Sequence, residues 1–359
     1  MNKPKQMVAS LNSLRYVLAL CVVLGHIFIL CFWNGNPRTV LGLQNLAVDG
    51  FFILSGFLLA KSCLKNNPET DEEQQNAFFA LTQKRIKRLW PEFMFATVFT
   101  LALAALFHMH VKQHDLLFNM VFLAQINNIP GIINGSWYIS VLFYVGLFYS
   151  FLLIRSRKYR FIVTAGAVFF SLSYLYAHFG NLSLNAFPLI GGFLSAGFIK
   201  GIMDIGLGIL LFQFAAFIHT NPLSVKQKYL PTVFIVLECL GIFLTVYAMV
   251  HAKINQNDFL ALFGFSILIP QLYYRKETIQ KFLSFKFWDA FSDSAYMLFL
   301  THVVLVEVIK SKWTLPRAPQ TYLALILFCT VCAKILYILQ KKVSAGFGKI
   351  LCDKDTAAQ

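Results

Sequence analysis

The chain contains ten runs of predominantly apolar residues, each close to the length that crosses a lipid bilayer. A spanning helix needs about 20 such residues, because each residue advances an α-helix by about 1.5 Å. The runs cover residues 14–33, 47–63, 89–107, 136–154, 161–179, 201–219, 229–249, 258–274, 291–309 and 321–338. Only 13% of the residues are charged, against about 25% in a soluble domain. We therefore expect an all-α integral membrane protein with ten transmembrane helices.

Lysine and arginine are distributed unevenly between the segments that join these runs. If the N-terminus is cytoplasmic, 23 of the 31 basic residues fall on the cytoplasmic side and 7 on the outer side. Because cytoplasmic loops of membrane proteins carry an excess of basic residues, both termini are expected in the cytoplasm. The same pattern accounts for the net charge of +15, so we expect the lipid bilayer and not nucleic acid as the partner. Residues 1–359 are expected to form one membrane domain.

The first run carries two residues that are costly inside a membrane, Arg15 and His26. Eleven helical steps of 100° bring them back to nearly the same face, with a rise of about 16 Å between them. A cation and a titratable base on one stripe indicate a catalytic pair. Taken singly, Arg15 could extend toward the headgroups and His26 could be a packing histidine.

Asp49 begins the apolar part of the second run, near the outer face. A carboxylate at that depth is able to orient a catalytic histidine, and we expect Asp49 to approach His26. The alternative is a carboxylate that stabilises the N-terminal end of a helix dipole. Gly50 and Gly56 on the same helix would allow another helix to approach closely.

Arg85 and Arg88 precede the third run and stand three residues apart, so they project together from a helix. The planar guanidinium group binds phosphate oxygens through two parallel hydrogen bonds. The pair therefore predicts a clamp for a phosphorylated ligand that arrives from the cytosol. The positive-inside bias alone is the alternative explanation.

Four further aromatic residues are candidates for substrate binding: Trp137, Tyr138, Tyr296 and His302. His302 lies well inside the ninth run, whereas Trp137 and Tyr138 open the fourth run and could simply belong to an interfacial aromatic belt. The histidine-rich run HMHVKQH at 108–114 implies no fixed coordination geometry. We expect no metal site.

Taken in order along the chain, these motifs resemble the acyltransferase-3 family of membrane acyltransferases. The resemblance covers nearly the whole sequence. It includes an arginine and a histidine separated by ten residues, the segment VDGFFILSGF at 48–57, an arginine pair followed by LWP at 89–91, and a tyrosine-to-histidine element at 296–302. Two elements depart from the family pattern. Leu142 stands where members with a WSL-x-VE motif have glutamate, so no catalytic carboxylate is expected there. The ninth-run element, usually SY-x-x-YL-x-H, here reads Ala295, Tyr296, Phe299, Leu300 and His302.

The resemblance implies an O-acyltransferase of the bacterial inner membrane that modifies surface glycans. Its donor would be an acyl-CoA, most simply acetyl-CoA, held by Arg85 and Arg88. Arg15 would draw in the donor's anionic or carbonyl groups, and His26 would act as general base on a hydroxyl of a glycan or lipid-linked sugar. The oligomeric state is left open.

Two other classes of protein use charged residues inside membranes. A transporter of a lipid-linked sugar or small anion would also carry intramembrane Arg, His and Asp, but such transporters commonly contain repeats, and none is visible here. A non-enzymatic scaffold would not explain why Arg15 and His26 share one face.

Overall fold

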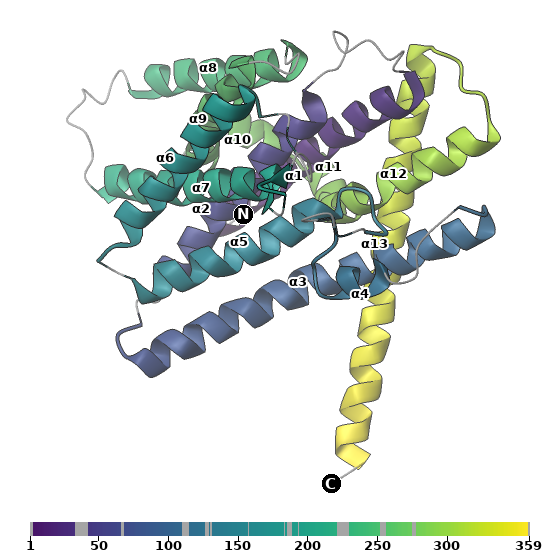
Figure 1. The fold of residues 1–359 in the computed structure, drawn as a ribbon, viewed down its shortest axis with the longest axis horizontal. Coiled ribbons are helices and arrows are strands. Elements are labelled where there is room, and N and C mark those ends of the chain that lie inside the picture. The colour runs from purple at the N-terminus through teal and green to yellow at the C-terminus, as the bar shows by residue number, and fades with distance from the viewer. Residues whose placement is uncertain are drawn as a thin grey trace.

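The computed structural model describes residues 3–32, 42–65, 68–109, 115–125, 129, 131–156, 158–182, 184, 189–192, 194–220, 230–251, 256–274 and 278–357. Residues 33 and 229, at the limits of two expected spans, and residues 110–114 of the histidine-rich run lie outside these ranges. The described chain is almost entirely helical, as expected (Figure 1).

The N-terminal half contains the long helices that carry the candidate residues. They are α1 (Lys3–Ile27) with its short continuation η1 (Phe28–Phe32), α2 (Leu43–Lys65), α3 (Asp71–Leu106), α4 (Asp115–Met120), α5 (Ser136–Arg155) and α6 (Arg160–Phe179). The C-terminal half contains a small hairpin of β1 (Leu189–Ile190) and β2 (Leu194–Ser195), followed by α7 (Ala196–Thr220), α8 (Leu230–His251), η3 (Gln256–Asp258), α9 (Phe259–Tyr274), α10 (Thr278–Leu283), α11 (Lys286–Ser292), α12 (Ala295–Lys312) and α13 (Pro319–Ala357).

Eight of the described helices are long and apolar enough to cross a membrane. A ninth span is possible if α11 and α12, which meet at a 59° bend, are counted as one. The remaining expected span, residues 258–274, corresponds to α9, whose 16 residues are fewer than the about 20 that a span needs. The membrane class is thus confirmed, while the count of ten and the cytoplasmic termini stay predictions.

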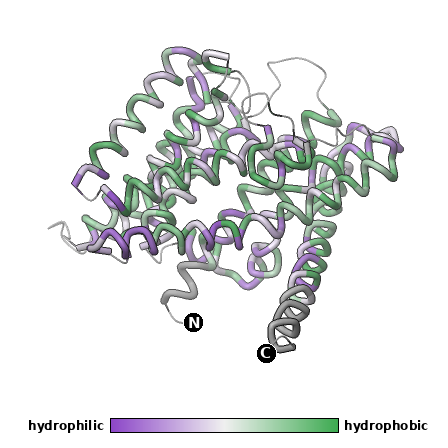
Figure 2. Tube along the Cα trace, turned by 60° about the horizontal axis from the view of Figure 1, so that its bottom comes forward, coloured by the Kyte–Doolittle hydropathy of each residue, from purple (hydrophilic) through white to green (hydrophobic). Residues whose placement is uncertain are grey.

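Exposed apolar surface explains why this bundle belongs in lipid. Phe169 and Phe170 on α6 are 64% and 72% exposed, and Phe243 on α8 is 61% exposed. Apolar residues also cover long stretches of the outward helices in Figure 2. Such surface would be unstable in water but suits a hydrocarbon environment.

Helix α2 occupies the centre of the bundle and packs against α1, α5, α7 and α9. Its closest neighbour is α7, because glycines remove the side chains at the crossing. A Cβ atom added at Gly56 would collide with the backbone carbonyl of Ile205, and one added at Gly208 would collide with that of Ile53. The close approach expected at Gly56 is confirmed, and α7 is the helix that makes it.

Helix α3 is longer than the third apolar run. It begins at Asp71 behind a capping box, in which the Thr70 hydroxyl accepts from the Glu73 backbone and the Glu73 carboxylate accepts from Thr70. Arg85 and Arg88 therefore lie on the same continuous helix as the span. Their separation of three residues places them on one face, which turns toward α5.

Candidate active site

The rings of His26 and His302 are hydrogen-bonded to each other across the α1–α12 interface. His302 Nε2 lies 3.0 Å from His26 Nδ1, and the ring centroids are 4.9 Å apart. His302 is only 1% exposed, whereas His26 is half-buried and keeps some accessible surface. The sequence singled out both residues, and the structure joins them into one pair.

The surrounding carbonyl groups fix the tautomer of each ring. His302 Nδ1 lies 3.0 Å from the Leu298 carbonyl oxygen and His26 Nδ1 lies 3.1 Å from that of Val22. A carbonyl oxygen only accepts hydrogen bonds, so each Nδ1 carries the proton. His302 Nε2 is then bare and accepts from His26 Nδ1–H, a single N–H that the Val22 carbonyl and His302 Nε2 share. This arrangement leaves His26 Nε2 with a free lone pair, which is the state a general base requires.

A group of three arginines lies toward the other end of α1. The charge of Arg15 interacts with that of Arg88, which also interacts with Arg85. Tyr138 on α5 lies within electrostatic reach of all three. We call these four residues the arginine cluster. It unites four candidates to which the sequence had assigned three different roles.

Within the arginine cluster, no arginine forms an ion pair with a described carboxylate. Glu92 lies near Arg88, but its ion-pair partner is Lys341, 3.9 Å away. Arg85 donates to the Leu142 carbonyl at 3.0 Å, and its Nε is buried with no partner among the described residues. Arg15 and Arg85 are half-buried and Arg88 is exposed. Three cations without a described counter-charge form a site that suits an anion.

Leu142 and Gly146 explain how Arg85 reaches this position. A Cβ atom at Gly146 would overlap the Arg85 guanidinium, so the glycine provides the space for it. At the position where the family motif carries glutamate, this chain presents the Leu142 backbone carbonyl to Arg85. A carbonyl anchors the guanidinium without neutralising its charge.

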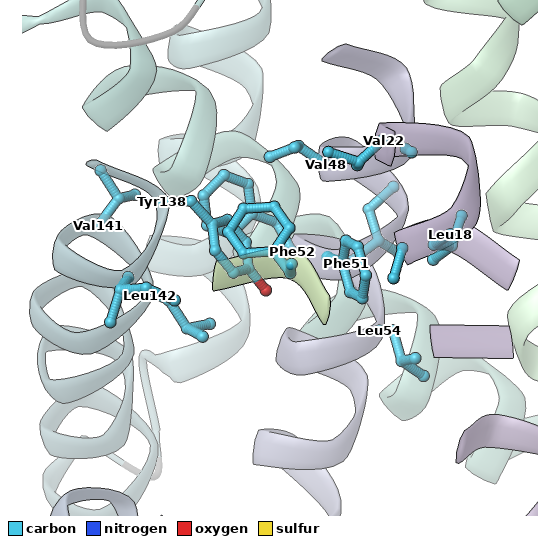
Figure 3. Packing of buried hydrophobic residues seen from close by; sticks show 14 of the residues in the cluster. Leu18, Val22, Val48, Phe51, Phe52, Leu54, Tyr138, Val141 and Leu142 are labelled. Atoms are coloured by element: carbon cyan, nitrogen blue, oxygen red, sulfur yellow. The ribbon is translucent and has the colours of Figure 1, made fainter. Parts of the chain in front are cut away.

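Aromatic rings connect the arginine cluster with the histidine pair. The Tyr138 ring lies 5.0 Å from that of Phe299, and the Phe299 ring lies 6.2 Å from that of His302. Phe51 on α2 contacts both Tyr138 and Phe299, at 5.9 and 6.0 Å. In Figure 3 the Phe51 and Phe52 rings lie between the α1 residues and the Tyr138 ring. The cluster and the pair are therefore two ends of one continuous buried path.

The comparison with known families decides the class of this site. The family model described as acyltransferase domain, that of the acyltransferase-3 family, matches residues 8–339. The chain belongs to the acyltransferase-3 family. No curated protein and no solved structure matches the chain. With its apolar helices, the protein is a multi-pass membrane acyltransferase, and this membership favours acyl transfer over the transporter and scaffold alternatives.

Asp49 of this membrane acyltransferase has a different neighbour from the one the sequence suggested. Its carboxylate lies 2.7 Å from Lys200 Nζ on α7, and both side chains are fully buried. Asp204, also fully buried, lies within electrostatic reach of Asp49 and of Lys200. Asp49 was expected to orient the His26 ring, but the partner of that ring is His302. Asp49 accordingly belongs to the α2–α7 contact.

The remaining candidates of the acyltransferase also lie inside the bundle. Trp137 is 8% exposed, and its ring meets Phe52 edge-on at 6.1 Å. The Tyr296 hydroxyl donates to the Leu89 carbonyl at 3.4 Å and lies within electrostatic reach of Arg88. Trp137 and Tyr138 are thus buried residues of α5 and do not form an interfacial belt.

A cavity of about 130 Å³ lies between α3 and α12 and includes Thr100, Asn134 and Glu307 in its lining. Leu300 and Val304 also line it. They stand two residues on either side of His302, and two helical steps turn by about 200°. The cavity therefore faces away from the histidine pair and adds nothing to the reacting centre.

Sequence reasoning missed Lys200, Phe51 and Phe299 as parts of this region. The spacing of Lys200 and Asp204, four residues apart on one helix, indicates a local pair, but it gives no signal that Lys200 reaches Asp49 on another helix. Phe51 and Phe299 lie inside the motifs at 48–57 and 296–302, but no role was assigned to either among the 38 phenylalanines of the chain.

Proposed function

We propose that this acyltransferase moves an acetyl group from acetyl-CoA to a hydroxyl of a cell-surface or lipid-linked glycan in the bacterial inner membrane. The donor enters from the cytosolic side, and the acceptor approaches from the outer half of the bilayer. The observation that carries the proposal is the 3.0 Å contact between His302 Nε2 and His26 Nδ1. With both protons on Nδ1, as the neighbouring carbonyls require, it directs the lone pair of His26 Nε2 away from His302. The acyl group and the acceptor are parts of the proposal.

The reaction requires one proton transfer and one exchange of bonds. His26 Nε2 accepts the proton of the sugar hydroxyl while the oxygen attacks the thioester carbonyl carbon. The carbon–sulfur bond then breaks, and the CoA thiolate takes up the proton. The products are an ester and the free CoA thiol. The imidazolium formed in between is stabilised by its Nδ1–H bond to His302, much as a carboxylate stabilises histidine in hydrolase triads.

The arginine cluster is the proposed site for the CoA phosphates. Arg85 and Arg88 would bind phosphate oxygens, and Arg15, on the same face of α1 as His26, would lie along the donor's path. Two features support this assignment: the arginines form no ion pair with a described carboxylate, and Arg85 Nε has no described partner. A phosphate would supply both missing partners.

The length of the donor also matches the distance along α1 between Arg15 of the arginine cluster and His26 of the histidine pair. Arg15 and His26 are eleven residues apart on α1, a rise of about 16 Å. The pantetheine arm of CoA contains roughly twelve bonds between its phosphate and its sulfur. An extended peptide of about four residues has the same number of backbone bonds and reaches roughly 14 Å. A CoA whose phosphates lie at the arginines would therefore present its thioester close to the histidine pair.

Replacement of His26 tests the proposal directly. His26→Ala removes the base, so acyl transfer should fall by about 10²–10⁴-fold. Membranes that contain the protein and its natural acceptor would be supplied with radiolabelled acetyl-CoA, and the label on glycan would be measured. The matched control is His251→Ala, because His251 Nδ1 bonds the carbonyl four residues earlier, at 3.2 Å, from an exposed position. Unchanged glycan labelling by a well-folded His26→Ala protein would refute the proposed base.

A further inference from the structure

The path between the arginine cluster and the histidine pair is filled with aromatic side chains. Tyr138, Phe51 and Phe299 are 5%, 8% and 6% exposed. The centroids of their rings lie 5.0–6.0 Å apart. These rings come from three helices, α2, α5 and α12, and converge on one point. A donor that joins the two ends must therefore pass them or displace them.

Phe299 is the residue of this group whose ring contacts both the arginine cluster and the histidine pair. It meets Tyr138 of the arginine cluster at 5.0 Å and His302 of the histidine pair at 6.2 Å. Phe299 and His302 are three residues apart on α12, so they project toward the same side of the helix. The Phe299 ring consequently borders the space in which an acyl group next to His26 would lie.

We propose that Phe299 determines the length of the acyl group that this enzyme accepts, and that its ring restricts the site to short chains such as acetyl. The inference rests on the proposed function, because it takes the donor to be an acyl-CoA held at the arginine cluster. The physical reason is packing: the Phe299 ring is only 6% exposed and packs against Tyr138 and His302, so each additional methylene group of an acyl chain would have to displace it. A smaller residue would open an apolar space that a longer chain could fill.

The test compares the binding of two donors to the full chain in lipid nanodiscs. Equilibrium dissociation constants would be measured for acetyl-CoA and hexanoyl-CoA, with free CoA as the reference. The wild-type protein should bind acetyl-CoA more tightly than hexanoyl-CoA. In Phe299→Ala the ratio of the two constants should shift by about tenfold toward hexanoyl-CoA, which corresponds to the burial of about two methylene groups.

Phe143→Ala is the matched control. Phe143 is 8% exposed, close to the 6% of Phe299, and its ring contacts Phe122 and Tyr144 and neither histidine. This variant also loses a buried phenyl ring, so it should lower the melting temperature without changing the preference between donors. Phe299→Leu, which keeps most of the volume, should shift the preference in the same direction by a smaller factor and guards against misfolding of the alanine variant.

The outcomes separate this inference from the proposed function. A shift in Phe299→Ala and Phe299→Leu, absent from Phe143→Ala, supports the role of Phe299. Donor binding with an unchanged preference in both Phe299 variants overturns the inference and leaves the proposed function intact. Equal wild-type affinity for acetyl-CoA and hexanoyl-CoA also overturns it. If neither thioester nor free CoA binds the wild-type protein, the proposed function fails and this inference fails with it.

Discussion

Two cationic sites of this helical bundle, one at Lys200 and one at the arginine cluster, differ in what neutralises them. Lys200 is fully buried 2.7 Å from the Asp49 carboxylate, and it also donates to the carbonyls of Leu182 at 2.6 Å and Asn45 at 3.2 Å. The arginines of the arginine cluster form no ion pair with a described carboxylate. A buried charge that is fully paired holds helices together, whereas a cation without a counter-charge is available to a ligand. The comparison assigns a structural role to the first group and a binding role to the second.

The largest expected effect concerns the buried ion pair of Lys200 and Asp49. Lys200→Met leaves Asp49 and Asp204 buried together without a counter-cation. Breaking one partner of a buried ion pair typically costs about 3–5 kcal/mol, so the free energy of unfolding should fall by about that amount. The measurement is unfolding by sodium dodecyl sulfate in detergent micelles, followed by circular dichroism.

Lys334→Met is the control for that prediction. Lys334 Nζ lies 2.7 Å from the Asp293 carboxylate, the same distance as in the buried pair, but the two side chains are 27% and 45% exposed. Exposed ion pairs contribute less than about 1 kcal/mol. Equal destabilisation by Lys200→Met and Lys334→Met would contradict the structural role of the buried pair.

The second effect concerns the arginine cluster and should appear in the binding of acetyl-CoA. Arg88 is exposed and lies within electrostatic reach of the other three members of the arginine cluster. Arg88→Ala should weaken acetyl-CoA binding by about 10–100-fold, because a hydrogen bond to a charged group contributes about 1.5–3 kcal/mol. The KM for acetyl-CoA should rise while kcat changes little, which steady-state kinetics in membranes would reveal.

Lys87→Ala provides the matched control for Arg88→Ala. Lys87 is the adjacent residue of α3, it is also exposed, and its removal changes the net charge by the same amount. One helical step turns it by about 100° from Arg88. An equal rise in KM for Lys87→Ala would mean that the general positive charge of the surface, and not the cluster, attracts the donor.

Much of this arrangement followed from local patterns in the sequence. The apolar runs predicted the helices, since length and composition determine what can cross a bilayer. The spacing of Arg15 and His26 predicted a shared face because it depends only on helix geometry. The same holds for Arg85 and Arg88, which α3 carries on one side. These features need no knowledge of which helices are neighbours.

The partners of these residues could not be predicted in the same way. Asp49 was assigned to His26, whereas the crossing at Gly56 and Gly208 places α7 beside α2 and brings Lys200 to Asp49. His302 was identified only as a candidate for substrate binding, and its hydrogen bond to His26 depends on the packing of α12 against α1. Contacts between helices far apart in sequence depend on the complementary shapes of their surfaces, which a single sequence does not display.

The smallest expected effect uses salt to separate the two groups of cations. Mobile ions screen exposed charges, and the Debye length falls from about 10 Å at 0.1 M to about 3 Å at 1 M, but buried pairs are screened much less. Raising potassium chloride from about 0.1 M to about 1 M should therefore increase the KM for acetyl-CoA several-fold. The difference in unfolding free energy between wild-type and Lys200→Met protein should stay constant over the same range. If that difference shrinks with salt while the KM stays constant, then water and ions reach Lys200 and not the arginines, and the structural and binding roles must be exchanged.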